Sequence, residues 1–366
     1  MTLGIAPVVS RIERDDLGSM RNEWTALLAR CGATLPFLSW AWVSAWLDTL
    51  GASADLEVLT ARDATDGRLV GIAPFVVERR HRAGISHHVL RFLGSGAAAP
   101  DHLDLVVEDG RHDIAIALWS ALEAERRWDL VDFDGALAGG LVEDLALRRS
   151  TDLARHTALI PYRRLPLAGE WEDVEAQFGR NHRTNIRRYA RKMDQEAGAP
   201  VSVRLVAEPD DVVDTMERLG ELHQQVRIAQ GDEGAFATPQ LRRFHTTVAV
   251  RLAEAGRLRL HRLDVGGEMA AAICCFRQAD TVAFYTTGYD ERWGRFGPGR
   301  RIMAEAIRSA LEEGATEFDF LRGDEPYKRS WGARVHHDLR ITRPTTRRGR
   351  ILWVGRSARR ILRRDQ

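Results

Sequence analysis

Lysine is almost absent from the 366-residue sequence: of 53 basic residues, only Lys192 and Lys328 are lysines. Arginine enrichment on this scale is typical of genomic base composition, so arginine counts alone carry little functional weight. Cysteine is scarce too. The three cysteines, with Cys274 and Cys275 adjacent, give neither a disulfide framework nor metal-ligand spacing. We therefore expect no disulfide-stapled fold and no bound metal.

Long hydrophobic runs are also missing. No window reaches the roughly 18 apolar residues that a membrane-spanning helix needs. The first residues lack the basic stretch of a signal peptide. We therefore expect a soluble, cytoplasmic protein. With 44% hydrophobic and 29% charged residues, the chain has the composition of a globular protein and a length that suits two domains.

The formal net charge of +1 hides an asymmetry along the chain. Residues 340–366 include ten arginines and one acid, so this stretch carries +9 and the remainder −8. Apolar residues such as Trp353 lie among the arginines of the tail. This pattern suits a peripheral position on the inner face of an anionic membrane, or a partner protein, and a partly disordered solubilising tail is an equal alternative. We expect no DNA partner.

Hydrophobic periodicity predicts two halves with the same order of elements, strands followed by a helix and a further strand. The predicted elements of the first half are helices at 21–30 and 39–51, strands at 56–61, 69–77 and 103–107, a helix at 112–126 and a strand at 129–134. Those of the second half are strands at 258–264, 268–276 and 281–287, a helix at 299–313 and a strand at 317–321.

A helical insert separates the two copies, with helices predicted at 171–178, 181–196, 210–229 and from the N-cap Thr238 to about 255. The proline-containing segment 161–166 is the best domain boundary. We therefore predict an α/β protein with domains at 1–165 and 166–345, the second of which includes the insert, and a basic amphipathic tail at 346–366.

The most specific feature is the segment GRFGPGRRIM at 294–303, which follows a predicted strand and opens a predicted helix. Its glycines let the backbone turn tightly and approach an anion, while Pro298 presets the helix entry. Free N–H groups and the dipole of a helix N-terminus suit a pyrophosphate, and Arg300 and Arg301 add positive charge. A plain glycine-proline turn that starts a helix is an equally good explanation of the loop alone.

A second feature follows the last predicted strand, in the segment FDFLRGDEPYKRSWGA at 318–333. Acyl transfer needs a base for the nucleophile, an acid or donor for the leaving thiolate, and a donor aimed at the thioester oxygen. Asp324 or Glu325 is a candidate base, Tyr327 a candidate acid, and Lys328 a candidate anchor for an anionic acceptor. A solvated charged loop explains the charges equally well, but it explains Tyr327 and Trp331 less well.

The predicted helix at 181–196 carries a stripe of basic residues that includes Arg183 and Arg187. Such a stripe is usually a solvated face. If it faces the cleft between the copies, it would bind the CoA phosphate or an anionic acceptor. His223 and Tyr285 are secondary catalytic candidates.

Five segments together resemble the CelD/BcsL-type acetyltransferases of the tandem-GNAT group, which also includes the FemAB-like peptidyltransferases. They are PFLSWAWVSAW at 36–46, LVGIAPFVVERR at 69–80, NHRTNIRRYARKM at 181–193, GRFGPGRRIM at 294–303 and DFLRGDEPYKRSWG at 319–332. The resemblance implies two tandem GNAT-like (acyl-CoA N-acyltransferase) domains. It also implies acetyl-CoA or another acyl-CoA as donor, and an acceptor from envelope or exopolysaccharide metabolism, such as a sugar or polysaccharide precursor.

The resemblance also implies roles for individual residues. The donor's pyrophosphate would contact Phe296, Gly297, Pro298, Gly299, Arg300 and Arg301. The strand at 283–287 would supply the thioester contact through Phe284 and Thr286. The acceptor would meet Asp319, Arg322, Trp331, Arg183 and Arg187. The loop departs from the usual Q/R-x-x-G-x-G/A pattern, because Gly294 stands at its first position.

The first copy has an acidic junction, VEDGRHD at 107–113, where the second has the glycine loop. Carboxylates there would repel a pyrophosphate, so we expect only the second copy to bind CoA. Two alternatives stay open: a FemAB-like transferase that uses aminoacyl-tRNA, and a non-catalytic module of a membrane-associated polysaccharide synthesis complex.

Overall fold

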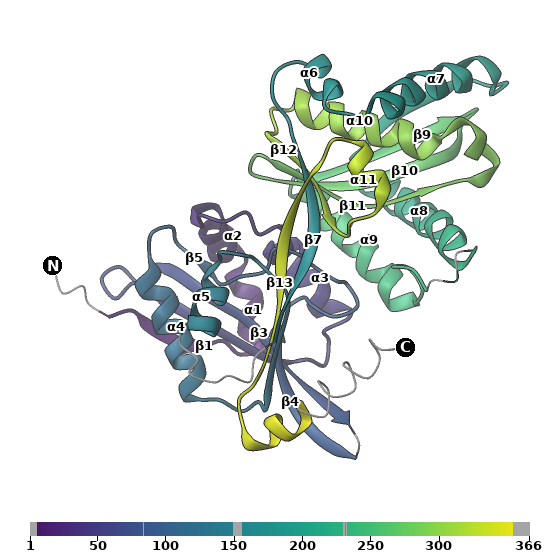
Figure 1. The fold of residues 1–366 in the computed structure, drawn as a ribbon. Helices are drawn as coiled ribbons and strands as arrows, with labels where there is room; N and C mark the ends of the chain where they lie inside the picture. Colours follow the sequence, from purple (N-terminus) through teal and green to yellow (C-terminus); the bar gives the residue numbers. More distant parts are fainter. Residues whose placement is uncertain (1–5, 83, 149–155, 230, 232, 354–366) are drawn as a thin grey trace. The chain divides into compact units, whose positions relative to one another are not determined.

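A computed structural model describes residues 6–82, 84–148, 156–229, 231 and 233–353 (Figure 1). The chain forms two compact units. Unit 1 comprises Met1–Leu47, Gly51–Ile160 and His337–Gln366, and unit 2 comprises Asp48–Leu50 and Pro161–His336. The domain limits expected at 165 and 345 stay a prediction. Of the expected tail, residues 347–353 are helical and 354–366 lie outside the described residues.

The elements from the start of the chain to β7 are β1 (Val8–Arg11), α1 (Arg14–Leu17), η1 (Gly18–Met20), α2 (Arg21–Arg30), η2 (Pro36–Leu38), α3 (Trp40–Asp48), β2 (Asp55–Arg62), β3 (Leu69–Arg82), β4 (Ile85–Phe92), β5 (Val106–Val107), α4 (His112–Ala124), β6 (Leu130–Ala136), α5 (Leu141–Arg148) and β7 (His156–Pro166). Strands β1 to β4 pair as antiparallel neighbours, and β6 runs parallel to β4. Three aromatic rings, Phe75, Phe92 and Phe133, pack in the core with centroids 4.8–5.4 Å apart.

The remaining elements are α6 (Trp171–Ala176), α7 (Arg180–Glu196), β8 (Val201–Val206), α8 (Pro209–Ala229), α9 (Pro239–Glu254), β9 (Leu258–Val265), β10 (Glu268–Gln278), β11 (Thr281–Tyr289), η3 (Glu291–Phe296), α10 (Pro298–Glu312), β12 (Glu317–Arg322), α11 (Pro326–Ser330) and β13 (Arg334–Pro344). Strands β8 to β11 pair as antiparallel neighbours, and β12 runs parallel to β11. In unit 2, α10 and α7 cover one face of this sheet, and α8 and α9 cover the other (Figure 1).

Helix α10 shows why the sequence pattern gives this packing. Its apolar residues recur every three or four positions, so that Ile302, Met303, Ala306, Ile307 and Ala310 share one buried stripe. The stripe packs against β9, β10 and β11, and Pro298 occupies the first turn, where it leaves no hydrogen bond unmade. Across the described residues, no helix is both long enough and apolar enough to cross a membrane.

The two units repeat one topology and exchange their last strands. In each unit a helix, α4 or α10, connects two parallel neighbours, β4 and β6 or β11 and β12. Strand β13, late in the chain, then pairs with β6 of unit 1. Strand β7, which precedes the helical insert, pairs with β12 of unit 2. In each unit the strand next to β6 or β12 therefore comes from the other half of the sequence.

Segment 161–166, the predicted domain boundary, is the second half of β7 and is hydrogen-bonded to β12, and the chain passes from unit 1 to unit 2 between Ile160 and Pro161. Other sequence-based assignments differ from the structure. The strand expected at 103–107 is reduced to β5, with Leu103 in an isolated bridge to Ala136. Strands β4 and β13 were not expected, because polar and basic residues interrupt their apolar pattern. Whether these segments form strands therefore depends more on pairing with distant segments than on their local sequence pattern.

Gly332, which follows α11, lies in a tightly packed part of unit 2. Its φ is 75°, and an added Cβ would lie 2.3 Å from the carbonyl oxygen of Gln177. We expect Gly332→Ala to lower the free energy of unfolding by at least about 2 kcal/mol, measured by urea denaturation, because left-handed strain and a backbone clash add.

Gly314→Ala is the matched control, because its φ is 77° and no atom lies within 4 Å of the added Cβ. The free energy of unfolding of this variant should fall by only about 1 kcal/mol, which is the cost of the left-handed backbone alone. Equal losses in the two variants would show that the contact with Gln177 has no energetic weight.

Candidate acyl-transfer site

The parallel ladder between β11 and β12 ends early. Only Thr281, Val282 and Ala283 pair with Glu317, Phe318 and Asp319, although β11 continues to Tyr289. Beyond Ala283, β11 therefore has no partner on β12. Parallel neighbours that part at their carboxyl ends commonly open a binding site there.

The departure of β12 has a local cause at Asp319. One carboxylate oxygen accepts the N–H of Leu321 at 2.8 Å, and the other accepts Arg164 Nε at 2.7 Å. Leu321 has a φ of 55°, and the pairing with β7 shifts register between Asp319 and Arg322. A left-handed residue inside a strand turns the strand out of its ladder. Asp319, expected to touch the acceptor, is instead 1% exposed and supports the backbone.

Strand β11 carries a bulge in the segment that β12 leaves. Cys274 pairs with Thr286 and Cys275 with Phe284, so Tyr285 is skipped in the ladder with β10. Bulges re-aim side chains and occur often beside active sites. Phe284 and Thr286 are buried, and Phe284 packs against Phe320 with ring centroids 6.3 Å apart. Their main chain, rather than their side chains, is therefore the part available for a ligand contact.

The glycine loop follows β11 directly. Gly297, with a φ of 59°, ends η3 and is the N-cap of α10. Its carbonyl accepts the N–H groups of Arg300 at 3.0 Å and Arg301 at 3.2 Å. The N–H of Gly299 has no hydrogen-bond partner in the described part of the chain, and Phe296 is fully buried beneath the turn. The loop is thus a fixed helix start that presents an amide to an anion.

The two arginines of the loop differ in their partners. Arg301 donates to Asp194 of α7 at 2.6 Å, so its charge is already neutralised. Arg300 lies over the ring of Tyr189, 5.5 Å from its centroid, without a carboxylate partner among the described residues. Arg188 lies over the same ring at 4.9 Å. Arg300, rather than Arg301, is therefore the cation that this loop presents.

The basic stripe on α7 is likewise partly neutralised. Arg187 forms an ion pair with the buried Glu175 of α6. Arg183 is half-buried and has no carboxylate partner in the described part of the chain. The expected solvated face therefore includes one structural ion pair.

A network of histidine and tyrosine lies beside the bulge. His245 Nε2 donates to the carbonyl of Ala235 at 2.9 Å, so the Nδ1 of the neutral ring accepts the hydroxyl of Tyr285 at 3.0 Å. His223 Nδ1 is 3.0 Å from the carbonyl of Thr287, which only accepts, so Nδ1 carries the proton and Nε2 the lone pair.

His223 reaches β11 because α8 approaches the strand at a glycine. An added Cβ at Gly288 would lie 2.7 Å from the carbonyl oxygen of Leu219 and 2.9 Å from the backbone nitrogen of His223. Only glycine therefore permits this separation. The sequence does not predict a role for His245, because its partners are 10 and 40 residues away and no local pattern marks them.

The charged segment after β12 is largely occupied by internal contacts. Asp324 accepts Arg163 Nε at 2.7 Å and forms an ion pair with Arg329, and these guanidinium groups lower the pKa of its carboxyl. Lys328 is 3% exposed, and its Nζ donates to the carbonyls of Leu321 at 3.2 Å and Arg322 at 2.6 Å. It also pairs with Glu325 at 2.9 Å.

These contacts give most of the segment a supporting role. Lys328 fixes the backbone where β12 turns, and Asp324 ties α11 to β7. Trp331 is 2% exposed and packs against Phe178 and His182, so it lies in the core. Arg322 is half-buried beside the turn. Glu325 and the 45% exposed Tyr327 are the two predicted catalytic side chains that remain accessible.

Residues 180–329, from α7 to α11, match the family model of the acetyltransferase (GNAT) domain. This part of the chain is a GNAT acetyltransferase domain. The expected acyltransferase class is thereby confirmed. The match covers the ladder that ends early, the bulge and the glycine loop. A comparison with curated protein sequences finds no match.

Solved structures resemble the chain over nearly its whole length. A crystal structure of FemX superposes with a TM-score of 0.63 at 10% identity, covering 91% of this chain and 96% of that one. A conserved protein of unknown function from Bacteroides thetaiotaomicron VPI-5482 gives 0.55 at 14% identity, with coverages of 93% and 100%. The C-terminal domain of a protein described as a lysylphosphatidylglycerol synthetase, from Agrobacterium fabrum, gives 0.55 at 11% identity, with coverages of 92% and 94%. The predicted α/β fold with two GNAT-like units is confirmed.

The buried network predicts a loss of stability in mild acid. Burial lowers the pKa of His245 from 6.5 to about 4, so the unfolded chain binds a proton that the folded chain refuses between these values. The contribution of neutral His245 to the free energy of unfolding is therefore complete above pH 6.5 and is lost as the pH falls toward 4. Between about pH 7 and about pH 5, we expect His245 alone to contribute about 2 kcal/mol of this loss.

Urea denaturation of His245→Gln at the two pH values measures this contribution. On acidification, the free energy of unfolding of the variant should fall by about 2 kcal/mol less than that of the wild type. The exposed His88 supplies the control His88→Gln, which should leave the wild-type pH dependence intact. An unchanged pH dependence in His245→Gln would contradict the prediction.

Proposed function

We propose that unit 2 transfers an acyl group from an acyl-CoA, acetyl-CoA in the simplest case, to an amine or hydroxyl of a sugar or polysaccharide precursor. The observation that carries the proposal is the conjunction of three features on β11. Its ladder with β12 ends at Ala283, its bulge lies at Tyr285, and only the short helix η3 separates its end from the start of α10.

The residues at the start of α10 fit a pyrophosphate. The N–H of Gly299 and the helix dipole favour negative charge, and Arg300 adds a cation. Gly297 is favoured here by its φ of 59°, and a Cβ added to it would make only ordinary contact with the ring of Tyr189, at 3.6 Å. These features support the predicted donor contacts at Gly297, Gly299 and Arg300, and give Arg301 a structural contact instead.

His223 is the base that the geometry supports best. Because its Nδ1 proton is bonded to Thr287, its Nε2 lone pair can take the proton of the acceptor. As the acceptor nitrogen or oxygen bonds to the thioester carbon, the carbon–sulfur bond breaks and CoA leaves as thiolate. Glu325 and Tyr327 stay candidates for acceptor binding or for protonation of the thiolate.

The acceptor class rests on the motifs shared with the CelD/BcsL-type acetyltransferases. A cytoplasmic location, with the tail at a membrane surface, is a separate proposal that rests on the composition of the sequence and of its tail. FemAB-like transfer from aminoacyl-tRNA is the second candidate. It is favoured by the likeness to FemX and by α7, where Arg183 and Arg188 have no carboxylate partners in the described residues.

Ligand-induced stabilisation separates the two candidates. We expect CoA or acetyl-CoA, at about 100 times its Kd, to raise the melting temperature by about 5 °C or more. Gly299→Asp should abolish this rise, because a carboxylate at the helix start repels the pyrophosphate. Differential scanning fluorimetry with CoA, acetyl-CoA and longer acyl-CoAs measures the effect.

Gly256→Asp is the matched control, because it adds the same charge at an open left-handed position outside the loop. CoA or acetyl-CoA should still raise the melting temperature of Gly256→Asp as it does for the wild type. If no CoA species stabilises the wild type and tRNA binding is retained, the aminoacyl-tRNA alternative replaces the present proposal.

His223→Gln tests the base. Its kcat should fall about 10²- to 10⁴-fold while the acetyl-CoA-induced rise in melting temperature is kept, because the variant removes proton transfer and not donor binding. The assay is thiol release from acetyl-CoA with hexosamines and nucleotide-linked hexosamines as acceptors. Glu325→Gln, assayed in parallel, should lower kcat less than His223→Gln does, because Glu325 is not the proposed base. A His223→Gln variant with wild-type kcat would assign the base elsewhere.

A further inference from the structure

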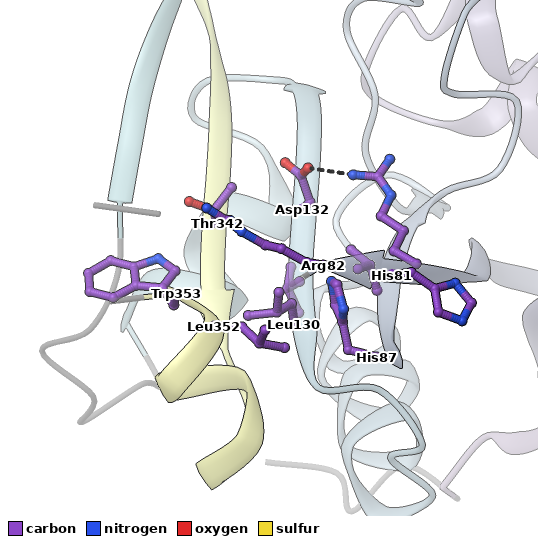
Figure 2. A pocket seen from close by; sticks show the side chains of 11 residues that line it. His81, Arg82, His87, Leu130, Asp132, Thr342, Leu352 and Trp353 are labelled. Carbon is purple, nitrogen blue, oxygen red and sulfur yellow. Dashed lines mark ion pairs between the residues drawn. The ribbon is translucent and has the colours of Figure 1, made fainter. Parts of the chain in front are cut away.

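Arginines line a pocket of unit 1, but their charge is largely used within the protein (Figure 2). Arg80 pairs with Glu78 at 2.9 Å and lies 4.0 Å from Asp132. Asp132 also binds Arg340 through both of its oxygens, at 2.9 Å and 2.8 Å. Guanidinium groups that are paired in this way have little charge left for a ligand, so an anion site is expected where arginines lack carboxylate partners.

Two such arginines lie around the ring of Tyr189 in unit 2. The guanidinium carbon of Arg188 is 4.9 Å from the centroid of this ring, and that of Arg300 is 5.5 Å from it. Both arginines are exposed, and neither has a carboxylate partner within the described ranges. We call Arg188, Tyr189 and Arg300 the Tyr189 cluster. Its two like charges repel each other, and an anion bound beside them would remove this cost.

The contact between α7 and α10 places the Tyr189 cluster against the glycine turn (Figure 1). Arg301 of α10 donates to Asp194 of α7 at 2.6 Å and so links the two helices. A Cβ added to Gly297 would lie 3.4 Å from Arg300 Nη1 and 3.6 Å from the ring of Tyr189. The cluster therefore borders the start of α10, where the pyrophosphate of the donor is expected.

The neighbouring groups of α7 leave the charge of the cluster positive. Burial and the charge of Arg300 lower the pKa of His182 from 6.5 to about 4, so this ring is neutral at pH 7. The carboxylate of Asp194 is already paired with Arg301. Arg295, in the same loop as Arg300, is exposed, lies over the ring of Phe296 at 4.6 Å and adds a further cation.

The chemistry of CoA supplies an anion at the required place. Besides its pyrophosphate, CoA has a phosphate on the 3′-oxygen of its ribose, and this group carries roughly two negative charges near pH 7. One ribose separates the two groups, so a protein that binds the pyrophosphate at a helix start meets the 3′-phosphate close beside it. Arginine suits this group, because its planar guanidinium donates two parallel hydrogen bonds to phosphate oxygens.

We propose that the Tyr189 cluster binds the 3′-phosphate of the donor, and that Arg188 distinguishes CoA from donors that lack this phosphate. Tyr189 is a positioning residue, since its ring holds both guanidinium groups beside the turn. Arg300 lies between the two phosphate sites and serves both. This inference rests on the proposed acyl-CoA donor and adds a source of donor specificity outside the glycine loop.

Isothermal titration of the full chain with CoA and dephospho-CoA, which differ only in the 3′-phosphate, tests the assignment. We expect the wild type to bind CoA at least about tenfold more tightly than dephospho-CoA. Arg188→Gln should weaken CoA by about tenfold and leave the affinity for dephospho-CoA unchanged. Arg188→Lys, which keeps the positive charge, should restore part of the preference for CoA.

Arg243→Gln is the matched control. It removes the same charge from an exposed arginine of α9, which covers the opposite face of the sheet, and it should bind both ligands as the wild type does. Equal affinity of the wild type for CoA and dephospho-CoA would overturn the inference while the proposed donor stands. Equal weakening of both ligands in Arg188→Gln would do the same.

A different result would overturn the proposed function as well. If neither CoA nor dephospho-CoA binds the wild type, the acyl-CoA donor fails and the assignment of the 3′-phosphate fails with it. Binding of tRNA that is lost in Arg188→Gln would then assign the Tyr189 cluster to the aminoacyl-tRNA alternative.

Discussion

The buried carboxylate of Asp319 determines the geometry of unit 2. By accepting the N–H of Leu321 and the guanidinium of Arg164, it stabilises a left-handed residue within a strand. Such backbone costs about 1–3 kcal/mol and persists only where its surroundings fix it. Here Lys328, buried beneath the turn, donates to the two carbonyls that the turn displaces. The segment that looks catalytic by composition thus secures the place where β12 leaves β11.

The functional features of unit 2 depend on that departure. Beyond Ala283 one edge of β11 has no partner on β12, and the other edge bulges at Tyr285. Helix α8 approaches at Gly288 and brings His223 to the same stretch. Unit 1 has the same strand order, but the residues before α4 include Glu108 and Asp109, and Glu108 is ion-paired with Arg30 and Arg68. The two units therefore share an architecture but differ in the charge at the start of the corresponding helix.

The sequence predicts the parts of this arrangement that local chemistry dictates. The apolar stripe of α10, the glycines before it and the Thr238 N-cap all lie where pattern places them. The sequence does not predict which charged side chains form ion pairs with residues far away in the chain. Asp324 meets Arg163 across 161 positions and Asp319 meets Arg164 across 155. Nothing in the neighbourhood of these carboxylates shows that they are paired, so Asp319, Asp324 and Lys328 look reactive in the sequence and are supporting in the fold.

The exchange of terminal strands has a consequence for biosynthesis. Strand β6 of unit 1 is made early, yet its antiparallel neighbour β13 ends at Pro344, after every residue of unit 2 has been synthesised. During translation β6 therefore lacks its antiparallel neighbour until β13 has been made, whereas β8 to β12 are contiguous in the chain and pair with one another in the order of their synthesis or close to it. The order in which the ribosome delivers the strands thus differs from the order in which they can pair.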